Sequence, residues 1–161
     1  MADAWEQAKQ LSRRISDTSA QSTWDREQHG MGEIPPWQRR VISMLIALAA
    51  GSEIRFLDAS VEAEQASPTF VALTDERLIW VQASRDSNPA AFEAITIALS
   101  ELRVLRLLSV EDVHAGTTDF PMRLEVTLEF EGREVVLPVS KSPSQTVYKE
   151  LASVYPALLP R

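Results

Sequence analysis

The chain has 161 residues, 45% hydrophobic and 24% charged, which suits one folded domain with an appended segment and is too short for two large domains. It contains no cysteine, which excludes disulfides, thiolate metal sites and cysteine nucleophiles. Its formal net charge of −7 disfavours binding to nucleic acid and attachment to anionic lipid by charge alone.

The first predicted element is a short amphipathic helix over residues 3–15. Trp5, Ala8, Leu11 and Ile15 recur at three- and four-residue steps, as the apolar face of a helix requires. Acidic and aromatic residues stand at the start of the chain, where a secretory signal would carry basic residues followed by an apolar run. We therefore expect a cytoplasmic protein.

A second helix is predicted over residues 36–50, after a polar linker over residues 16–35 that shows no apolar period. Pro36 suits the first turn of this helix, and Gly51 suits its end. The segment is the most apolar in the chain, but it is well short of the ~20 residues that cross a bilayer as a helix. The two helices and the linker make up an N-terminal helical extension, residues 1–50.

The second helix has hardly any polar face in its second half, so its apolar residues must be covered on more than one side. Two kinds of cover are open. The two helices cover each other and the rest of the same chain, or a second copy of the chain packs on this segment and forms a homo-oligomer. Under the second hypothesis the self-association surface consists of Trp37, Val41, Leu45 and Leu48.

From Gly51 onward the apolar pattern changes to the period of two that is typical of strands. We predict strands over residues 53–61, 69–73, 78–81, 92–99, 104–110, 123–131 and 133–139. Residues 74–77 form a polar turn between the second and third strands, in which Asp75 can accept hydrogen bonds from backbone N–H groups. The strand over residues 104–110 has apolar residues on both faces, so its register is undetermined.

The last two strands allow the most specific prediction. If Glu131 and Gly132 form a two-residue turn, the apolar faces of both strands coincide in a single register. That register pairs Phe130 with Arg133, Leu128 with Val135, Val126 with Leu137, and Leu124 with Val139. A C-terminal helix with an apolar stripe follows and ends near Pro156.

The order of elements predicts an α+β fold: two N-terminal helices, then a small antiparallel β-barrel of about seven strands capped by the C-terminal helix. Residues 70–81, Phe-Val-Ala-Leu-Thr-Asp-Glu-Arg-Leu-Ile-Trp-Val, resemble the turn between hydrophobic strands in the bacterial pleckstrin-homology-like (PH-like), GRAM-related domains. The resemblance covers about residues 51–156. It implies a PH-like barrel domain with its C-terminal helix over residues 51–161.

The sequence contains no pattern that predicts catalysis, a cofactor or a metal site. It has no Gly-x-Ser-x-Gly elbow and no glycine-rich phosphate loop. Glu111, Asp112 and Asp119 lie near His114, but their spacing matches no ligand motif, so we interpret them as a polar connection between strands. Eukaryotic relatives of the resembling family bind phosphoinositides through a basic cluster near the first hairpin loop. Here that loop, residues 61–68, carries two acids and no base, which disfavours a lipid ligand.

The predicted function is that of a non-enzymatic interaction module for a protein or peptide partner. Phosphotyrosine-binding domains, which are relatives of the resembling family, accept an extended peptide beside a barrel strand and the C-terminal helix. By this resemblance the groove lies near residues 104–110 and 148–155. Its partner-binding residues are Leu107, Tyr148, Leu151 and Tyr155.

Two other classes of function are open. A peripheral membrane or lipid-binding adaptor would use Trp37, Arg39 and Arg40 at the start of the apolar helix. A small-ligand binder would keep a cavity inside the barrel.

Overall fold

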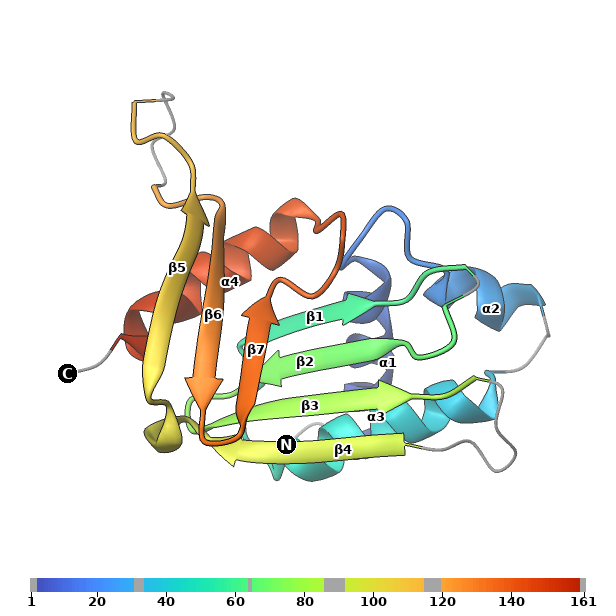
Figure 1. The fold of residues 1–161 in the computed structure, drawn as a ribbon. Helices are drawn as coiled ribbons and strands as arrows, with labels where there is room; N and C mark the ends of the chain where they lie inside the picture. The colour runs from blue at the N-terminus through green and yellow to red at the C-terminus, as the bar shows by residue number, and fades with distance from the viewer. Residues whose placement is uncertain (1–2, 31–33, 64, 86–91, 115–119, 160–161) are drawn as a thin grey trace.

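Two antiparallel sheets and four α-helices make up the parts of the chain that the computed structural model describes, residues 3–30, 34–63, 65–85, 92–114 and 120–159. The helices are α1 (Ala4–Ser16), α2 (Trp24–Gly30), α3 (Pro36–Ala49) and α4 (Gln145–Leu158). The first sheet contains β1 (Phe56–Ser60), β2 (Thr69–Leu73), β3 (Arg77–Ala83) and β4 (Phe92–Ala98), in that order. The second sheet contains β5 (Val104–Val110), β6 (Leu124–Phe130) and β7 (Arg133–Leu137), and its strands run across those of the first (Figure 1).

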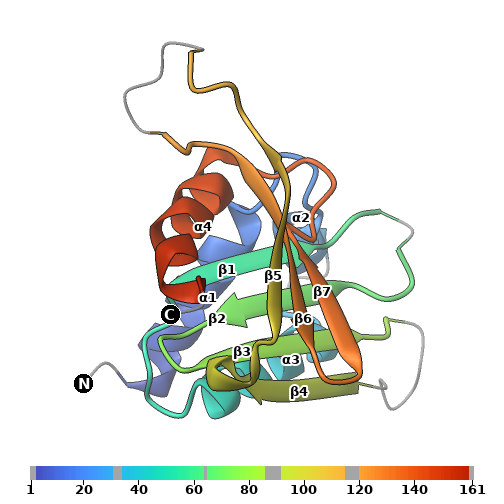
Figure 2. The same cartoon turned by 60° about the vertical axis from the view of Figure 1, so that its left-hand side comes forward.

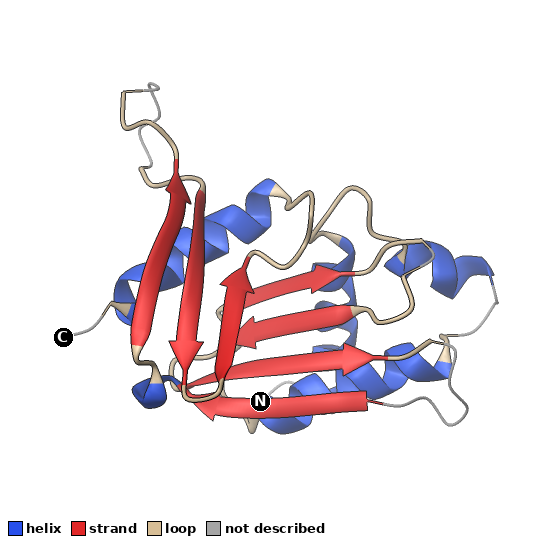
Figure 3. Ribbon diagram, viewed as in Figure 1, coloured by secondary structure: helices blue, strands red, loops and turns tan. Residues whose placement is uncertain are grey.

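One face of the first sheet is covered by α1 and α3, which lie behind it in Figure 3. The core between the helices and the sheet is built around three aromatic rings. The Trp24 ring meets those of Trp37 and Phe70 edge-on, with centroid distances of 5.6 and 5.7 Å. Such edge-to-face contacts stabilise a core beyond the burial of apolar area alone.

The other face of the first sheet packs against the second sheet and α4. Phe56, Val71 and Leu78 meet the inward side chains of β6 here, and Leu151 of α4 closes the layer. The central strands are therefore buried on both faces, because a hydrophobic layer lies on each side of the sheet.

The N-terminal segment is part of the hydrophobic core between the helices and the first sheet, which we call the first core. The predicted linker over residues 16–35 contains a helix, α2, whose Trp24 side chain is fully buried. Gln38 of α3 is also fully buried, and its amide donates to the Trp24 carbonyl at 3.1 Å and accepts from Gln28 at 2.9 Å. These hydrogen bonds satisfy the buried amide and tie α2 to α3.

The apolar side of α3 is covered within the chain itself. Val41 and Leu45 are fully buried, and Trp37 is 7% exposed. Leu48 is half-buried, and its carbonyl accepts a hydrogen bond from Arg77 at 3.2 Å. The first of the two predicted kinds of cover is therefore the one observed, and Trp37, Val41 and Leu45 do not form an exposed self-association surface. No helix in the described ranges is long and apolar enough to cross a membrane.

The predicted register of the last hairpin is confirmed for three of its four pairs. Phe130 lies opposite Arg133, Leu128 opposite Val135 and Val126 opposite Leu137. The fourth pair does not form because β7 ends at Leu137 and the Val139 N–H donates to Asp58 on β1 at 2.5 Å. Helix α4 continues past Pro156 to Leu158. The Leu158 side chain is buried in the hydrophobic layer between the two sheets and α4, which we call the second core.

The described strands form two separate sheets rather than the closed barrel that we predicted. The outer edge of β1 is occupied by other elements instead. The Glu150 carboxylate of α4 accepts from the Leu57 N–H at 2.9 Å and from Arg14 of α1 at 3.0 Å. Just after β1, the Val61 carbonyl accepts from the Thr23 N–H at 2.9 Å. These bonds satisfy edge groups that barrel closure would otherwise pair.

Candidate functional site

Strand β5 is an edge strand that carries exposed hydrophobic side chains. It pairs with β6 on one side, and the second sheet ends with it on the other. Val104, Leu107, Leu108 and Val110 are between 40% and 49% exposed, and we call these four residues the β5 patch. Six of the ten exposed large hydrophobic residues in the described ranges lie between Val104 and Phe120. Hydrophobic exposure is therefore concentrated at one edge of the molecule, which is a feature of binding surfaces.

A bulge divides β5. Leu107 lies opposite Val126 and Ser109 opposite Glu125, so Leu108 is an extra residue without a partner. Before the bulge, Leu107 lies on the inner side with the buried Val126, and after it Val110 lies on the inner side with the buried Leu124. The inner side of β5 is thus apolar but incompletely covered.

Beyond β5 the chain extends away from both sheets, as Figures 1 and 2 show for the described parts of the β5–β6 connection. Glu111 fastens the base of this connection. Its carboxylate accepts from the backbone N–H of Met122 and, at 2.7 Å, from that of Arg123. Partial desolvation favours the neutral carboxyl, but these backbone donors outweigh it and lower the pKa of Glu111. Val113 and Phe120, on the two sides of the connection, are 55% and 47% exposed.

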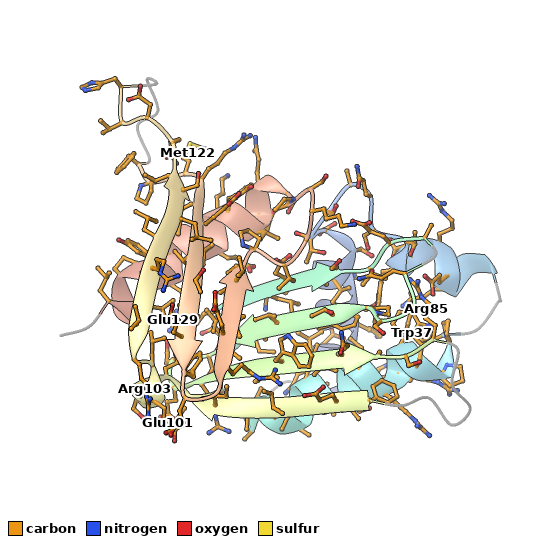
Figure 4. The ribbon with its side chains drawn as sticks, viewed as in Figure 1. Trp37, Arg85, Glu101, Arg103, Met122 and Glu129 are labelled. Carbon is orange, nitrogen blue, oxygen red and sulfur yellow. The ribbon has the colours of Figure 1, made fainter. Side chains whose placement is uncertain are left out.

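The arginine on β5, Arg106, and those just before β5 and β6, Arg103 and Arg123, already have partners. Arg103 pairs with Glu131 at 2.7 Å, and Arg106 pairs with Glu129. The Arg123 guanidinium lies over the Tyr148 ring, 5.7 Å from its centroid. Figure 4 shows Glu101 and Arg103 near one end of β5 and Met122, whose backbone N–H donates to Glu111, near the other. Charged groups therefore flank the patch at both ends.

Helix α4 contributes less to this surface than the sequence predicts. Leu107 is 46% exposed, whereas Leu151 is fully buried and supports the second core. Tyr155 is partly buried against that core, and Tyr148 is partly buried beneath Arg123. Because α4 packs chiefly against β1, the candidate surface is centred on β5 itself.

The sequence places the predicted groove near residues 104–110, but of the four exposed residues there it singles out Leu107 and not Val104, Leu108 or Val110. The signal was present, because apolar residues occupy both alternating positions in residues 104–110. The same pattern is normal in a central strand that is buried on both faces. An exposed edge strand such as β5 differs from it only in its position in the sheet, which the sequence does not give.

Of the three residues predicted for membrane attachment, Trp37 is engaged in the fold, whereas Arg39 and Arg40 are exposed. Trp37 is buried in the first core, and the Arg85 guanidinium lies 5.4 Å from the centroid of its ring. The Arg40 guanidinium lies 5.8 Å from the Phe92 ring centroid, and Arg39 is exposed. Trp37 is therefore not available to insert into a lipid surface.

The structure also has a cavity of about 580 Å³, and none of the four residues of the β5 patch lines it. It is lined by the β2–β3 turn, the end of β4 and the short 3-10 helix, with Asp75, Glu76 and Arg77 among its polar groups. It is at the ends of these strands rather than in the interior between the sheets, where the small-ligand alternative places its cavity. In the described ranges no group of three or more His, Asp or Glu residues could hold a metal ion.

No protein-family model matches the chain, and neither the curated proteins nor the solved structures compared with it include a match. The functional interpretation therefore depends on the geometry of the chain itself. Within that geometry, β5 carries four exposed large hydrophobic residues, whereas β7, the other edge strand of the second sheet, carries one, Val136.

Proposed function

We propose that the chain is a non-enzymatic interaction module that binds an extended segment of a protein partner along β5. The observation that carries this proposal is the β5 patch, whose aliphatic side chains lie on an unpaired strand edge. Adding a strand to such an edge uses its backbone hydrogen-bonding groups for affinity and the neighbouring side chains for specificity.

The two edges of the first sheet, β1 and β4, support this choice by contrast. Glu150 and Thr23 occupy the edge of β1, as described above. Strand β4 is also an edge strand, but none of its side chains is a large exposed hydrophobic. An exposed apolar edge invites aggregation unless it is protected or has a partner. The bulge at Leu108 and the charge of Arg106 protect the β5 edge only in part, because four exposed aliphatic side chains remain on it.

The fold supports the same class of function. Seven antiparallel strands followed by a C-terminal helix are the element order expected of the PH-like domains that residues 70–81 resemble, although the two sheets do not close into a barrel. A second copy of this chain is the alternative occupant of the β5 edge. The net charge of −7 disfavours it, because two copies of the chain repel each other, whereas the bulge at Leu108 interrupts the edge for any added strand alike.

The test is a selection of extended peptides from a random display library on the full chain. We expect the selected peptides to slow amide hydrogen exchange along β5. The double variant Leu107→Ser, Leu108→Ser should weaken their binding by about tenfold or more, as for central residues of an interface. The control is Val136→Ser on β7, which removes a side chain that is also about half exposed (45%) from the outer face of the same sheet.

Leu107, Leu108 and Val136 are each about half buried, so each variant should lower the unfolding free energy by roughly 1–3 kcal/mol and still fold, which urea denaturation checks before binding is compared. The proposal would be contradicted by peptides that slow amide hydrogen exchange in a strand other than β5, or by peptides that bind the double variant as tightly as the parent chain.

A further inference from the structure

The residues around the β5 patch include more carboxylates than the nearby arginines neutralise. Each arginine on β5, on β6 or at their ends is engaged, Arg103 with Glu131, Arg106 with Glu129, and Arg123 with the Tyr148 ring. A negatively charged partner would have to displace one of these contacts to find a cation here.

Several carboxylates around the patch have no cation beside them in the described part of the chain. Glu125 lies opposite Ser109, directly across from the second half of β5. Among the residues that the structure describes, the Asp112 carboxylate accepts from the backbone N–H of His114 alone, at 2.8 Å. Glu101, at the other end of β5, is exposed and has neither an ion pair nor a side-chain hydrogen bond.

We infer that the segment bound along β5 combines aliphatic side chains with lysine or arginine. Its aliphatic groups meet the β5 patch, and its cations meet Asp112 and Glu125 at the end of the strand near the β5–β6 connection. This inference rests on the proposed function and adds the charge of the partner. The net charge of −7 acts in the same direction by attracting cationic segments over longer distances. A phosphorylated peptide or an anionic headgroup would instead be repelled.

The same peptide selection tests this inference through the composition of its products. Peptides that protect β5 should be enriched in lysine and arginine and depleted in aspartate and glutamate. Their affinity should fall as ionic strength rises, since exposed charge pairs are screened by salt. A selection repeated on the double variant Asp112→Asn, Glu125→Gln should lose the enrichment.

For one selected peptide, that charge variant should lower the affinity about threefold to tenfold at low salt and flatten the salt dependence. Asparagine keeps the oxygen that accepts from His114, so the local turn is retained. The control is Asp25→Asn, Glu134→Gln, which removes two exposed carboxylates from α2 and β7 and should leave the affinity unchanged.

The two proposals fail in different ways. Neutral or acidic peptides that still protect β5, or equal affinity for the charge variant, would overturn the inference about charge and leave β5 as the binding edge. Peptides that do not protect β5 would overturn the proposed function, and the inference about charge with it.

Discussion

Asp58 is the side chain on which the junction between β1 and the β7–α4 connection depends. It is fully buried, and its two carboxylate oxygens accept from the backbone of Ala59, Val139 and Ser140 and from the Ser140 hydroxyl. Burial nevertheless raises the pKa of Asp58, because loss of water disfavours the charged form more than these donors favour it. The junction therefore holds a costly charge that is stabilised by hydrogen bonds.

The first prediction concerns Asp58→Ala, which leaves the donors of Val139 and Ser140 without their acceptor. We expect the free energy of unfolding to fall by about 1–3 kcal/mol near neutral pH. A carboxyl whose pKa is raised by folding contributes stability that is fully present below its unfolded pKa and is lost as pH rises through its folded pKa. The difference between parent and variant should therefore grow on acidification through the raised pKa.

Urea denaturation at a series of pH values measures this difference. Asp25→Ala, which removes an exposed aspartate from α2, is the control and should change stability by no more than about 0.5 kcal/mol. A difference that shrinks on acidification would show that the pKa of Asp58 is not raised.

At the scale of elements, α3 shows how an apolar helix is covered inside one chain. Its inward residues Val41 and Leu45 are fully buried between α1 and the first sheet. Its C-terminal end is also tied to the sheet, since Arg77 at the start of β3 donates to the Leu48 carbonyl. The helix is therefore part of the core and not an attachment to it.

We expect Leu45→Ala to lower the free energy of unfolding by about 2–5 kcal/mol, because it removes buried methyl groups and leaves a cavity. Ser43→Ala on the exposed side of α3 is the matched control and should have a much smaller effect. Urea denaturation and light scattering measure the outcome. A variant that kept its stability but dissociated from a dimer would support self-association through α3 instead.

At the scale of the whole molecule, the first 50 residues are required by the rest of the chain. Trp24 and Trp37 pack against Phe70 of β2, and α1 and α3 cover the apolar face that also includes Ile79 and Val81. Removing residues 1–50 would expose this face to water, although the strands that form it would all be present.

We therefore predict that a fragment over residues 51–161 does not fold cooperatively by itself. Nuclear magnetic resonance spectra should show poor dispersion of amide signals, and urea should produce no sharp unfolding transition. Adding the segment of residues 1–50 as a separate peptide should restore part of the dispersion if burial of this face is the cause. A well-dispersed spectrum of the fragment alone would show that residues 51–161 form an independent domain.

Local patterns in the sequence were sufficient for most elements and for one register. The period of two in residues 124–130 placed β6 and its pairing with β7, because a shift of one residue would turn every apolar side chain outward. The stop at Gly51 was also local, since Ala50 and Gly51 take positive φ angles of 50° and 83° that end α3. In the turn at residues 74–77, however, the Thr74 hydroxyl and not Asp75 accepts the backbone N–H groups, at 3.1 and 3.2 Å.

The amino-acid order by itself determined where the strands and most helices form, because periodicity and capping act between neighbours in the chain. Which apolar face is covered was decided only by the tertiary structure. Val41 and Leu107 are equally apolar in the sequence, yet one is fully buried and the other is 46% exposed. Burial depends on contacts between segments far apart in the chain, and β5 is exposed because the second sheet ends there.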